Sequence, residues 1–167
     1  MNASAILSPL AASLACAGVL ASIGAAGVLA GEPWLIASLG ASALLQLLAP
    51  RLPAARAWNT AAGQLVGFAA GFAAVYALGA TAAPHVATTE PMTWIRVAAA
   101  ALAIAITALG QRLIKATNPA GGSTALLIAL GKIRPTAHGA WLVVVGILLV
   151  TLIGEAARFA LLWVESE

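Results

Sequence analysis

Long runs of apolar residues, separated by short polar or proline-containing stretches, set the pattern of this chain. A helix needs roughly 20 apolar residues to cross a bilayer, and four runs reach that length: 10–30, about 58–80, 94 to about 115, and 139–164. The last run is bracketed by Trp141 and Trp163, which lie about 33 Å apart along a helix axis, as interfacial aromatic belts do. We therefore predict four transmembrane helices.

Two further apolar runs, residues 35–49 and 121–130, are too short to cross a bilayer comfortably as helices. Each lies between two prolines, and these are Pro33, Pro50, Pro119 and Pro135. Apolar stretches of this length are more often re-entrant or interfacial than membrane-spanning. We therefore predict two short re-entrant half-helices, and an all-α membrane protein overall.

The two short runs resemble each other in sequence. Residues 40–45 align without a gap on residues 122–127, at an offset (122 minus 40) close to half the chain. The same offset brings Trp58 close to Trp141. We therefore predict a twofold internal repeat, an arrangement that is common in transporters. We predict one transmembrane domain, residues 1–167. Its first repeat covers residues 10–80 approximately, and its second covers residues 93–164 approximately.

Composition agrees with a membrane protein and excludes several other classes. Hydrophobic residues make up 62% of the chain and charged residues 8%, whereas soluble domains carry roughly 25% charged residues. The single cysteine, Cys16, excludes an internal disulfide, and neither His85 nor His138 has a second metal ligand beside it. Because no nucleophile and base stand out together, we expect no enzyme, no cofactor and no metal site.

The basic residues lie at the ends of the apolar runs, where they set the orientation of membrane helices. If both short segments are re-entrant, one side of the membrane collects most of the positive charge: Arg51, Arg56, Arg112, Lys115, Lys132 and Arg134. This predicts that the half-helix loops face the cytoplasm of a bacterial inner membrane and that both termini lie on the opposite side. If the short segments crossed fully, the basic residues would divide almost evenly.

The short segments open with small and hydroxylated residues, which suits a site for an anion. A half-helix that begins inside the membrane leaves N–H groups unpaired, and these form the positive end of the helix dipole. Glycines let a ligand approach the backbone, and hydroxyl groups add donors. We predict a small-anion site formed by Gly40, Ala41, Ser42, Asn118, Gly121, Gly122, Ser123 and Thr124. The alternative is that the hydroxyl groups only cap their own helices.

The triplet Asn118-Pro119-Ala120 lies at the start of the second short segment and matches a known channel motif. This sequence, at the mouth of a half-helix, marks the aquaporins, in which two copies meet at mid-membrane. Only one copy occurs here, and the matching stretch of the first half has no Asn. An aquaporin-like channel for neutral solutes therefore remains a minor alternative.

Residues inside the predicted long helices have two interpretations each. Gly63, Gly67 and Gly71 recur every four residues, which favours tight packing over a sliding or gating interface and also suits a homo-oligomer contact. Glu155 and Arg158 share one helix face, so they form either a coupling site in a pore or a structural pair. Three glutamines either bond between helices or line a pore, and these are Gln46, Gln64 and Gln111.

The ordered set of motifs resembles the HPP family of integral membrane proteins. The stretch 40–43, then Pro50, then 56–59 and Gly63, is similar to the first half of that family. The block 118–127 is similar to the segment that names it, usually His-Pro-Pro-Ala-Gly-Ala-Thr-Ala. Asn118 replaces the histidine, and one proline stands where the family has two.

The resemblance implies movement of nitrite, or else nitrate, because family members are implicated in nitrite transport in chloroplasts and cyanobacteria. It also implies an alternative. Other members are fused to nucleotide-sensing domains, so the chain is otherwise a membrane sensor or assembly subunit that transports nothing.

Overall fold

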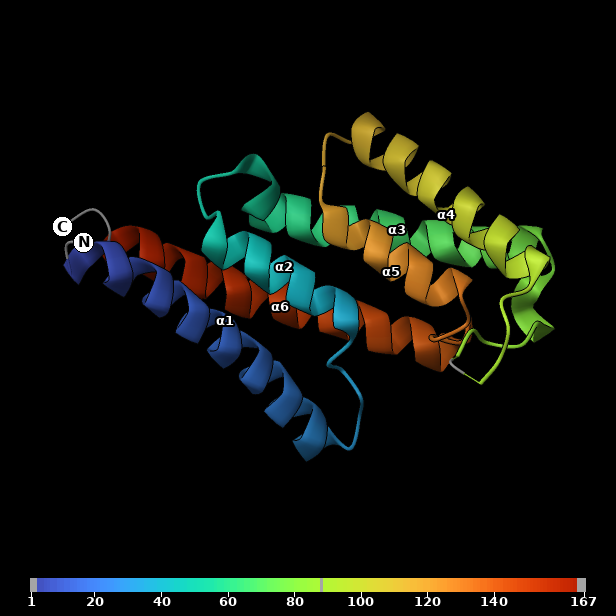
Figure 1. Ribbon diagram of the computed structural model, residues 1–167, viewed down its shortest axis with the longest axis horizontal. Coiled ribbons are helices and arrows are strands. Elements are labelled where there is room, and N and C mark those ends of the chain that lie inside the picture. Colours follow the sequence, from blue (N-terminus) through green and yellow to red (C-terminus); the bar gives the residue numbers. More distant parts are fainter. Residues whose placement is uncertain (1–2, 88, 165–167) are drawn as a thin grey trace.

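The computed structural model describes residues 3–87 and 89–164, and this part of the chain is helical apart from its connections. Four helices are long and two are short (Figure 1). The long helices are α1 (Ala3–Ala30), α3 (Ala57–Ala77), α4 (Trp94–Leu113) and α6 (Ala137–Val164). The short helices are α2 (Ala37–Leu48) and α5 (Pro119–Ala129), and two 3₁₀ turns, η1 (Pro53–Ala55) and η2 (Ala80–Ala82), complete the elements. The predicted all-α class is confirmed.

The four long helices have the length and composition of membrane spans. Their most apolar windows have mean hydropathies between 1.3 and 2.2. In α3, 50% of the window is buried, whereas in α1 only 28% of it is buried. Helix α3 therefore lies at the centre and α1 at the edge. Large apolar side chains on the outer faces of the long helices are exposed, such as Leu29 on α1 and Leu152 on α6. The chain therefore forms a multi-pass membrane protein whose outer faces suit lipid.

The short helices begin and end where local signals place them. Asn118 caps α5, since its side-chain oxygen accepts a hydrogen bond from Ala120 N, and Pro119 occupies the first helical position. Gly131, with φ +78°, ends the same helix in the left-handed conformation. Extended backbone at Ile36 precedes α2, and Pro50 follows it. Both helices are therefore confirmed, within a few residues of the predicted bounds.

The chain changes direction at every helix, including the short ones. Near the end of α6, Arg158 donates to the carbonyl oxygen of Pro50, in the α2–α3 connection. Near the end of α3, Tyr76 donates to the carbonyl oxygen of Pro135, in the α5–α6 connection. The two connections thus lie at opposite ends of α3. We call the end at which α1 begins and α6 ends the terminal end, and the other the distal end (Figure 1).

This path does not match two predictions. Each short helix starts at one end of the molecule and leads to the other, so re-entrant half-helices are not confirmed. The loops after the two short helices do not share a side either. The six basic residues predicted to share one side divide between the ends: Arg51, Arg56, Arg112 and Lys115 at the terminal end, and Lys132 and Arg134 at the distal end.

The helices pack in two groups of three around the short helices. Helix α2 packs against α1 and α6, and its Leu39 and Ala43 join Ile23 and Val150 in one apolar cluster. Helix α5 packs against α3 and α4 in a second cluster that includes Ile128. The groups meet through α2 against α5 and α3 against α6, so the short helices lie at the centre (Figure 1).

The glycine face of α3 is the contact surface for α5. A Cβ atom on Gly67 would overlap the backbone of Gly121, and one on Gly71 would lie 2.9 Å from Ile128 Cβ. Gly63 faces Asn118 in the same way. The packing interpretation is therefore confirmed within one chain. Because α5 covers this face, it is not available to a second copy, and a homo-oligomer would need another surface.

Candidate functional site

A fully buried cluster of three polar side chains joins the two short helices. The amide of Gln64, on α3, donates through Nε2 to Ser42 Oγ on α2 at 2.8 Å. Thr124 Oγ1, on α5, donates to Gln64 Oε1 at 3.0 Å. One side chain of α3 therefore bridges α2 and α5 at the point where they cross.

A second polar cluster lies nearer the terminal end and holds the start of α5. Gln111 Nε2, on α4, donates to the carbonyl oxygens of Gly63 at 2.9 Å and Asn118 at 2.8 Å. Gln111 Oε1 accepts from Asn118 N at 3.1 Å. Asn118 Nδ2 reaches Thr60 Oγ1 at 3.4 Å. The turn between α4 and α5 is thus fixed by side-chain amides, without any charge.

Two buried polar side chains on α2 have unused hydrogen-bonding capacity. Ser38 and Gln46 are 1% and 0% exposed, and Ser38 Oγ and both amide atoms of Gln46 have no partner among the described residues. They flank Ser42 at intervals of four residues, so the three share one helix face. A buried polar group without a partner costs about 1–3 kcal/mol. Such groups call for an explanation, and a transient ligand is one.

Together these residues form a buried polar seam in the middle of apolar helices. Along α2, Ser38 and Gln46 lie about 12 Å apart, with Ser42 midway. Along α3, Thr60 and Gln64 are one turn apart, and α3 begins at the terminal end. We define the polar seam as Ser38, Ser42, Gln46, Thr60, Gln64, Gln111, Asn118 and Thr124. It contains no charged side chain.

The predicted site residues are only partly brought together. Ser42, Asn118 and Thr124 belong to the seam. Gly121 is closed off, because a Cβ there would overlap Gly63 O. The other four are not in the seam: Gly40 is half-buried with open space around it, Gly122 is half-buried beside Ile104, and Ala41 and Ser123 are exposed.

The two helix N-termini do not converge on one site. Helices α2 and α5 run in opposite directions, so their starts point towards opposite ends of the molecule (Figure 1). The prediction that both N-termini bind one anion is therefore wrong, and the helices meet instead through side chains near their middles. At α5 the side chain of Asn118 caps the helix by accepting from Ala120 N, whereas no hydroxyl group caps either short helix, so the capping alternative is not confirmed for the hydroxyl groups.

Two buried arginines hold the C-terminal ends of the short helices. Arg158 forms a bidentate pair with Glu155 at 2.8 and 2.6 Å and also donates to Pro50 O, just after α2. Arg96 donates to the carbonyl oxygen of Ala129, the last residue of α5. Cations are favourable at this end of a helix. The geometry fits the structural interpretation of the Glu155–Arg158 pair, and a coupling role stays a prediction.

Sequence reasoning singled out the three glutamines but missed Ser38, Thr60 and Arg96. The intervals of four in Ser38-Ser42-Gln46 and Thr60-Gln64 carry the missing signal, because they place polar groups on one helix face. Arg96 follows Trp94 so closely that its sequence position suggests only an interfacial anchor.

The charges around the seam favour an anion. Basic residues lie at both ends of the molecule, whereas two of the three described acids are already engaged. Glu155 pairs with Arg158, and Glu32 Oε2 lies 3.4 Å from His138 Nε2. A positive field raises the local concentration of anions. In the described part of the chain, no group of three or more His, Cys, Asp or Glu residues is arranged to hold a metal ion.

Comparison with known proteins gives one clear match. The family model described as "HPP, transmembrane region" matches residues 2–165, nearly the whole chain. No curated protein and no solved structure matches. The polar seam therefore lies inside the transmembrane region of a member of the HPP family, the family to which this chain belongs.

Proposed function

We propose that this protein moves a small inorganic anion, with nitrite favoured and nitrate next, across a bacterial inner membrane. The observation that carries the proposal is the polar seam, an uncharged row of hydrogen-bonding side chains between basic molecular ends. Polar groups inside a membrane bundle commonly mark substrate pathways. The preference for nitrite rests on the resemblance to family members implicated in its transport.

The anion is stabilised by donors that replace part of its hydration shell. Ser42 Oγ accepts from Gln64, which leaves its own hydroxyl proton free to point at an ion. The amide of Gln46 and the hydroxyl of Ser38 have no other partner among the described residues. A neutral lining binds weakly enough for the ion to leave again, which conduction requires.

We further infer that α1–α3 and α4–α6 are two inverted copies of one repeat. Each copy has three helices, an odd number, so the chain leaves a copy on the side opposite to the one on which it began. The second copy therefore has the inverted orientation. The aligned segments place Ser42 opposite Thr124 in sequence, and both contact Gln64 in the structure. Transporters built from inverted repeats bind substrate at the repeat interface and alternate access by moving one part against the other.

Opening the seam requires α2 and α5 to separate at Gln64. The cost includes the hydrogen bond from that amide to Ser42, worth about 0.5–1.5 kcal/mol, whereas the bond from Thr124 to Gln64 is kept. A barrier of this size is compatible with repeated opening. The tight α3–α5 contact would stay intact, so α2 is the helix that we expect to move.

A paired substitution tests the proposal in proteoliposomes loaded with an anion-sensitive dye. Thr124→Val removes a hydroxyl from the seam, whereas Thr107→Val removes a buried hydroxyl that bonds only to Ala103 O of its own helix. We expect nitrite influx to fall about tenfold in the first variant and to change less than about twofold in the second. Equal effects, or wild-type influx no faster than in empty liposomes, would contradict the proposal.

A sensor or assembly subunit is the second candidate. The close packing of Gly63 and Gly67 against α5 favours it, because a rigid scaffold needs such packing. The same flux assay separates the two candidates. A partner that co-purifies in a fixed ratio, with no influx by the chain alone, would favour the sensor.

A further inference from the structure

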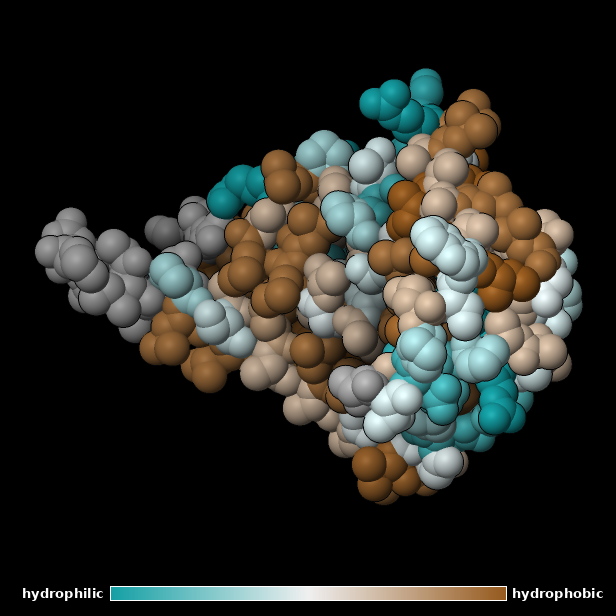
Figure 2. Space-filling view, turned by 45° about the vertical axis from the view of Figure 1, so that its right-hand side comes forward, coloured by the Kyte–Doolittle hydropathy of each residue, from teal (hydrophilic) through white to brown (hydrophobic). Residues whose placement is uncertain are grey.

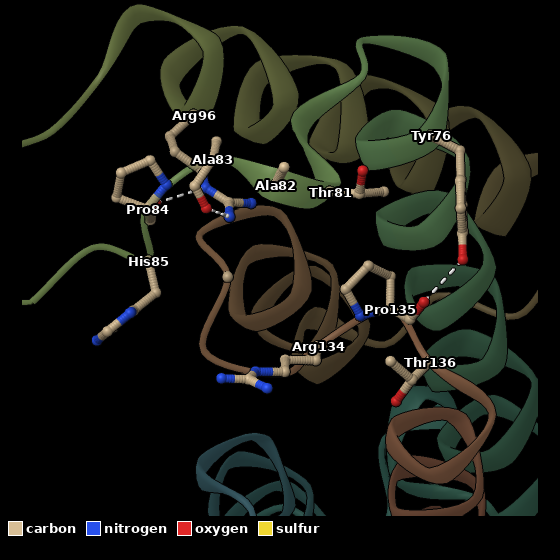
Figure 3. A pocket seen from close by; sticks show the side chains of 11 residues that line it. Tyr76, Thr81, Ala82, Ala83, Pro84, His85, Arg96, Arg134, Pro135 and Thr136 are labelled. Carbon is tan, nitrogen blue, oxygen red and sulfur yellow. Dashed lines mark hydrogen bonds between the residues drawn. The ribbon is translucent and has the colours of Figure 1, made fainter.

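A hollow at the distal end gathers basic side chains away from the polar seam. It has a volume of about 510 Å³, within the range of ~300–1,000 Å³ typical of small-molecule sites. The end of α3, η2, the first turn of α4 and the α5–α6 connection surround it (Figure 3). The polar residues that line it are Tyr76, Thr81, His85, Arg96, Arg134 and Thr136. None of the described residues that line it is acidic.

The hollow offers many donors that nothing in the described chain occupies. The side chains of Arg134 and His85 make no hydrogen bond or ion pair with the described residues, and Figure 3 shows them on one side of the hollow. Thr136 Oγ1 accepts from Gly139 N at 3.1 Å, so its hydroxyl proton remains free to donate. A lining that presents donors and positive charge without a carboxylate selects an anion.

Arg96 forms the back wall and is held in place by the backbone. Arg96 is 3% exposed, and its guanidinium donates to the carbonyl oxygens of Ala83, Pro84 and Ala129. Three of its five N–H donors are thereby used, and its positive charge has no carboxylate partner among the described residues. Gly131 is required beside it, because a Cβ would lie 2.6 Å from Nη2. The charge is fixed towards the hollow and cannot swing away.

The hollow lies at the level where lipid headgroups meet water. Trp94, 87% exposed, begins α4 two residues before Arg96, and Trp141 lies near the start of α6. Exposed tryptophans mark the membrane interface. Hydrophilic residues gather at this end of the molecule, while apolar residues cover much of the rest of the face (Figure 2). The anion that is most concentrated at this level is the phosphate of lipid headgroups.

We propose that this distal hollow binds a phosphate group, either in the headgroup of an anionic phospholipid or as inorganic phosphate. The guanidinium of Arg134 presents a planar fork that matches two phosphate oxygens. Arg96, whose charge is uncompensated, and His85 line the same hollow. The bound group would tie the α3–α4 and α5–α6 connections together. The site is separate from the seam and does not depend on transport.

The test uses the purified full chain in a neutral detergent, titrated by calorimetry with two probes. One probe is inorganic phosphate, and the other is a short-chain phosphatidylglycerol. Arg134→Gln changes an exposed residue and leaves the fold intact, which its melting temperature checks. Lys132→Gln removes the same charge two residues away, from a side chain that does not line the hollow, and serves as the matched control.

We expect saturable binding of at least one probe, weakened about tenfold by Arg134→Gln and less than about twofold by Lys132→Gln. Binding of phosphate alone identifies a site for a free anion, and binding of the lipid alone identifies a headgroup site. Failure of both probes to bind the wild type would overturn the proposal. Equal losses in the two variants would also overturn it, because they indicate unspecific attraction by net charge. Neither result bears on the flux through the seam.

Discussion

Substitution of single glycines provides a sharp test of the α3–α5 contact, because the same change is predicted to have opposite signs at two positions. Alanine stabilises a helix interior by about 1 kcal/mol relative to glycine. At Gly18, on α1, an added Cβ meets nothing within 4 Å, so this gain is retained. At Gly67, the added Cβ overlaps the carbonyl group and Cα of Gly121.

The overlap at Gly67 involves backbone, which cannot turn aside as a flexible side chain can. Helix α5 must therefore move away from α3, and overpacking of this kind costs about 1–3 kcal/mol or more. Since the added Cβ would lie well inside van der Waals contact with Gly121 O, the cost falls at the upper end of this range. After subtraction of the helix-propensity gain, we expect Gly67→Ala to lower the free energy of unfolding by about 2 kcal/mol. Gly18→Ala should raise it by up to about 1 kcal/mol.

Both variants can be measured by denaturant unfolding of the detergent-solubilised protein, followed by tryptophan fluorescence. Gly67→Ala should also slow nitrite influx, because Gln64 lies one turn away and bonds to α5. If Gly67→Ala proved as stable as wild type or more stable, the close approach of α3 and α5 would be refuted. A strong loss of stability in Gly18→Ala would refute the assignment of α1 to the lipid-facing edge.

Two further substitutions test the clusters that hold the short helices. Gln111→Leu removes three hydrogen bonds at the start of α5 and should lower the free energy of unfolding by about 2–4 kcal/mol, measured by the same denaturant unfolding; a loss below about 0.5 kcal/mol would contradict the described network. Glu155→Gln leaves the charge of Arg158 buried without a carboxylate and should lower the melting temperature, with a cost of about 3 kcal/mol. If Glu155→Gln instead kept full stability and abolished flux, Glu155 would be a coupling residue and not a structural partner.

The long and short helices could be predicted because run length and proline position decide them locally. The direction of the chain could not. A helix of 12 residues spans only about 18 Å, which suggests that it must turn back. In this structure, the non-helical segment 33–36 leads into α2, and a hydrogen-bonded turn at 49–52 followed by η1 leads from α2 to α3. Such backbone is tolerated at membrane depth where protein surrounds it, and only tertiary packing shows that it does.

The candidate site was predictable in part for a similar reason. Ser42 and Thr124 stand out because hydroxyl groups are conspicuous beside glycine in apolar runs. Their shared partner, Gln64, comes from a different helix, and no local pattern links the three. The sequence position of Arg96, close to Trp94, suggests an anchor at the membrane interface. It is buried instead because the last carbonyl group of α5 and the η2 turn converge on it.

The central claim is that the seam serves an anion as well as the stability of the fold, and Gln46 separates the two roles. Its amide is fully buried and has no partner in the described chain, so the folded state gains nothing from it. Methionine has a similar length and flexibility and can occupy the space beside Gly154. Replacing an unsatisfied polar group by an apolar one of similar shape is neutral or stabilising.

The most direct measurement is therefore nitrite influx into proteoliposomes that contain Gln46→Met, with the unfolding free energy of the same preparation. The account predicts an influx about tenfold below wild type together with stability that is equal or higher. An influx equal to that of wild type in a stable Gln46→Met protein would contradict it.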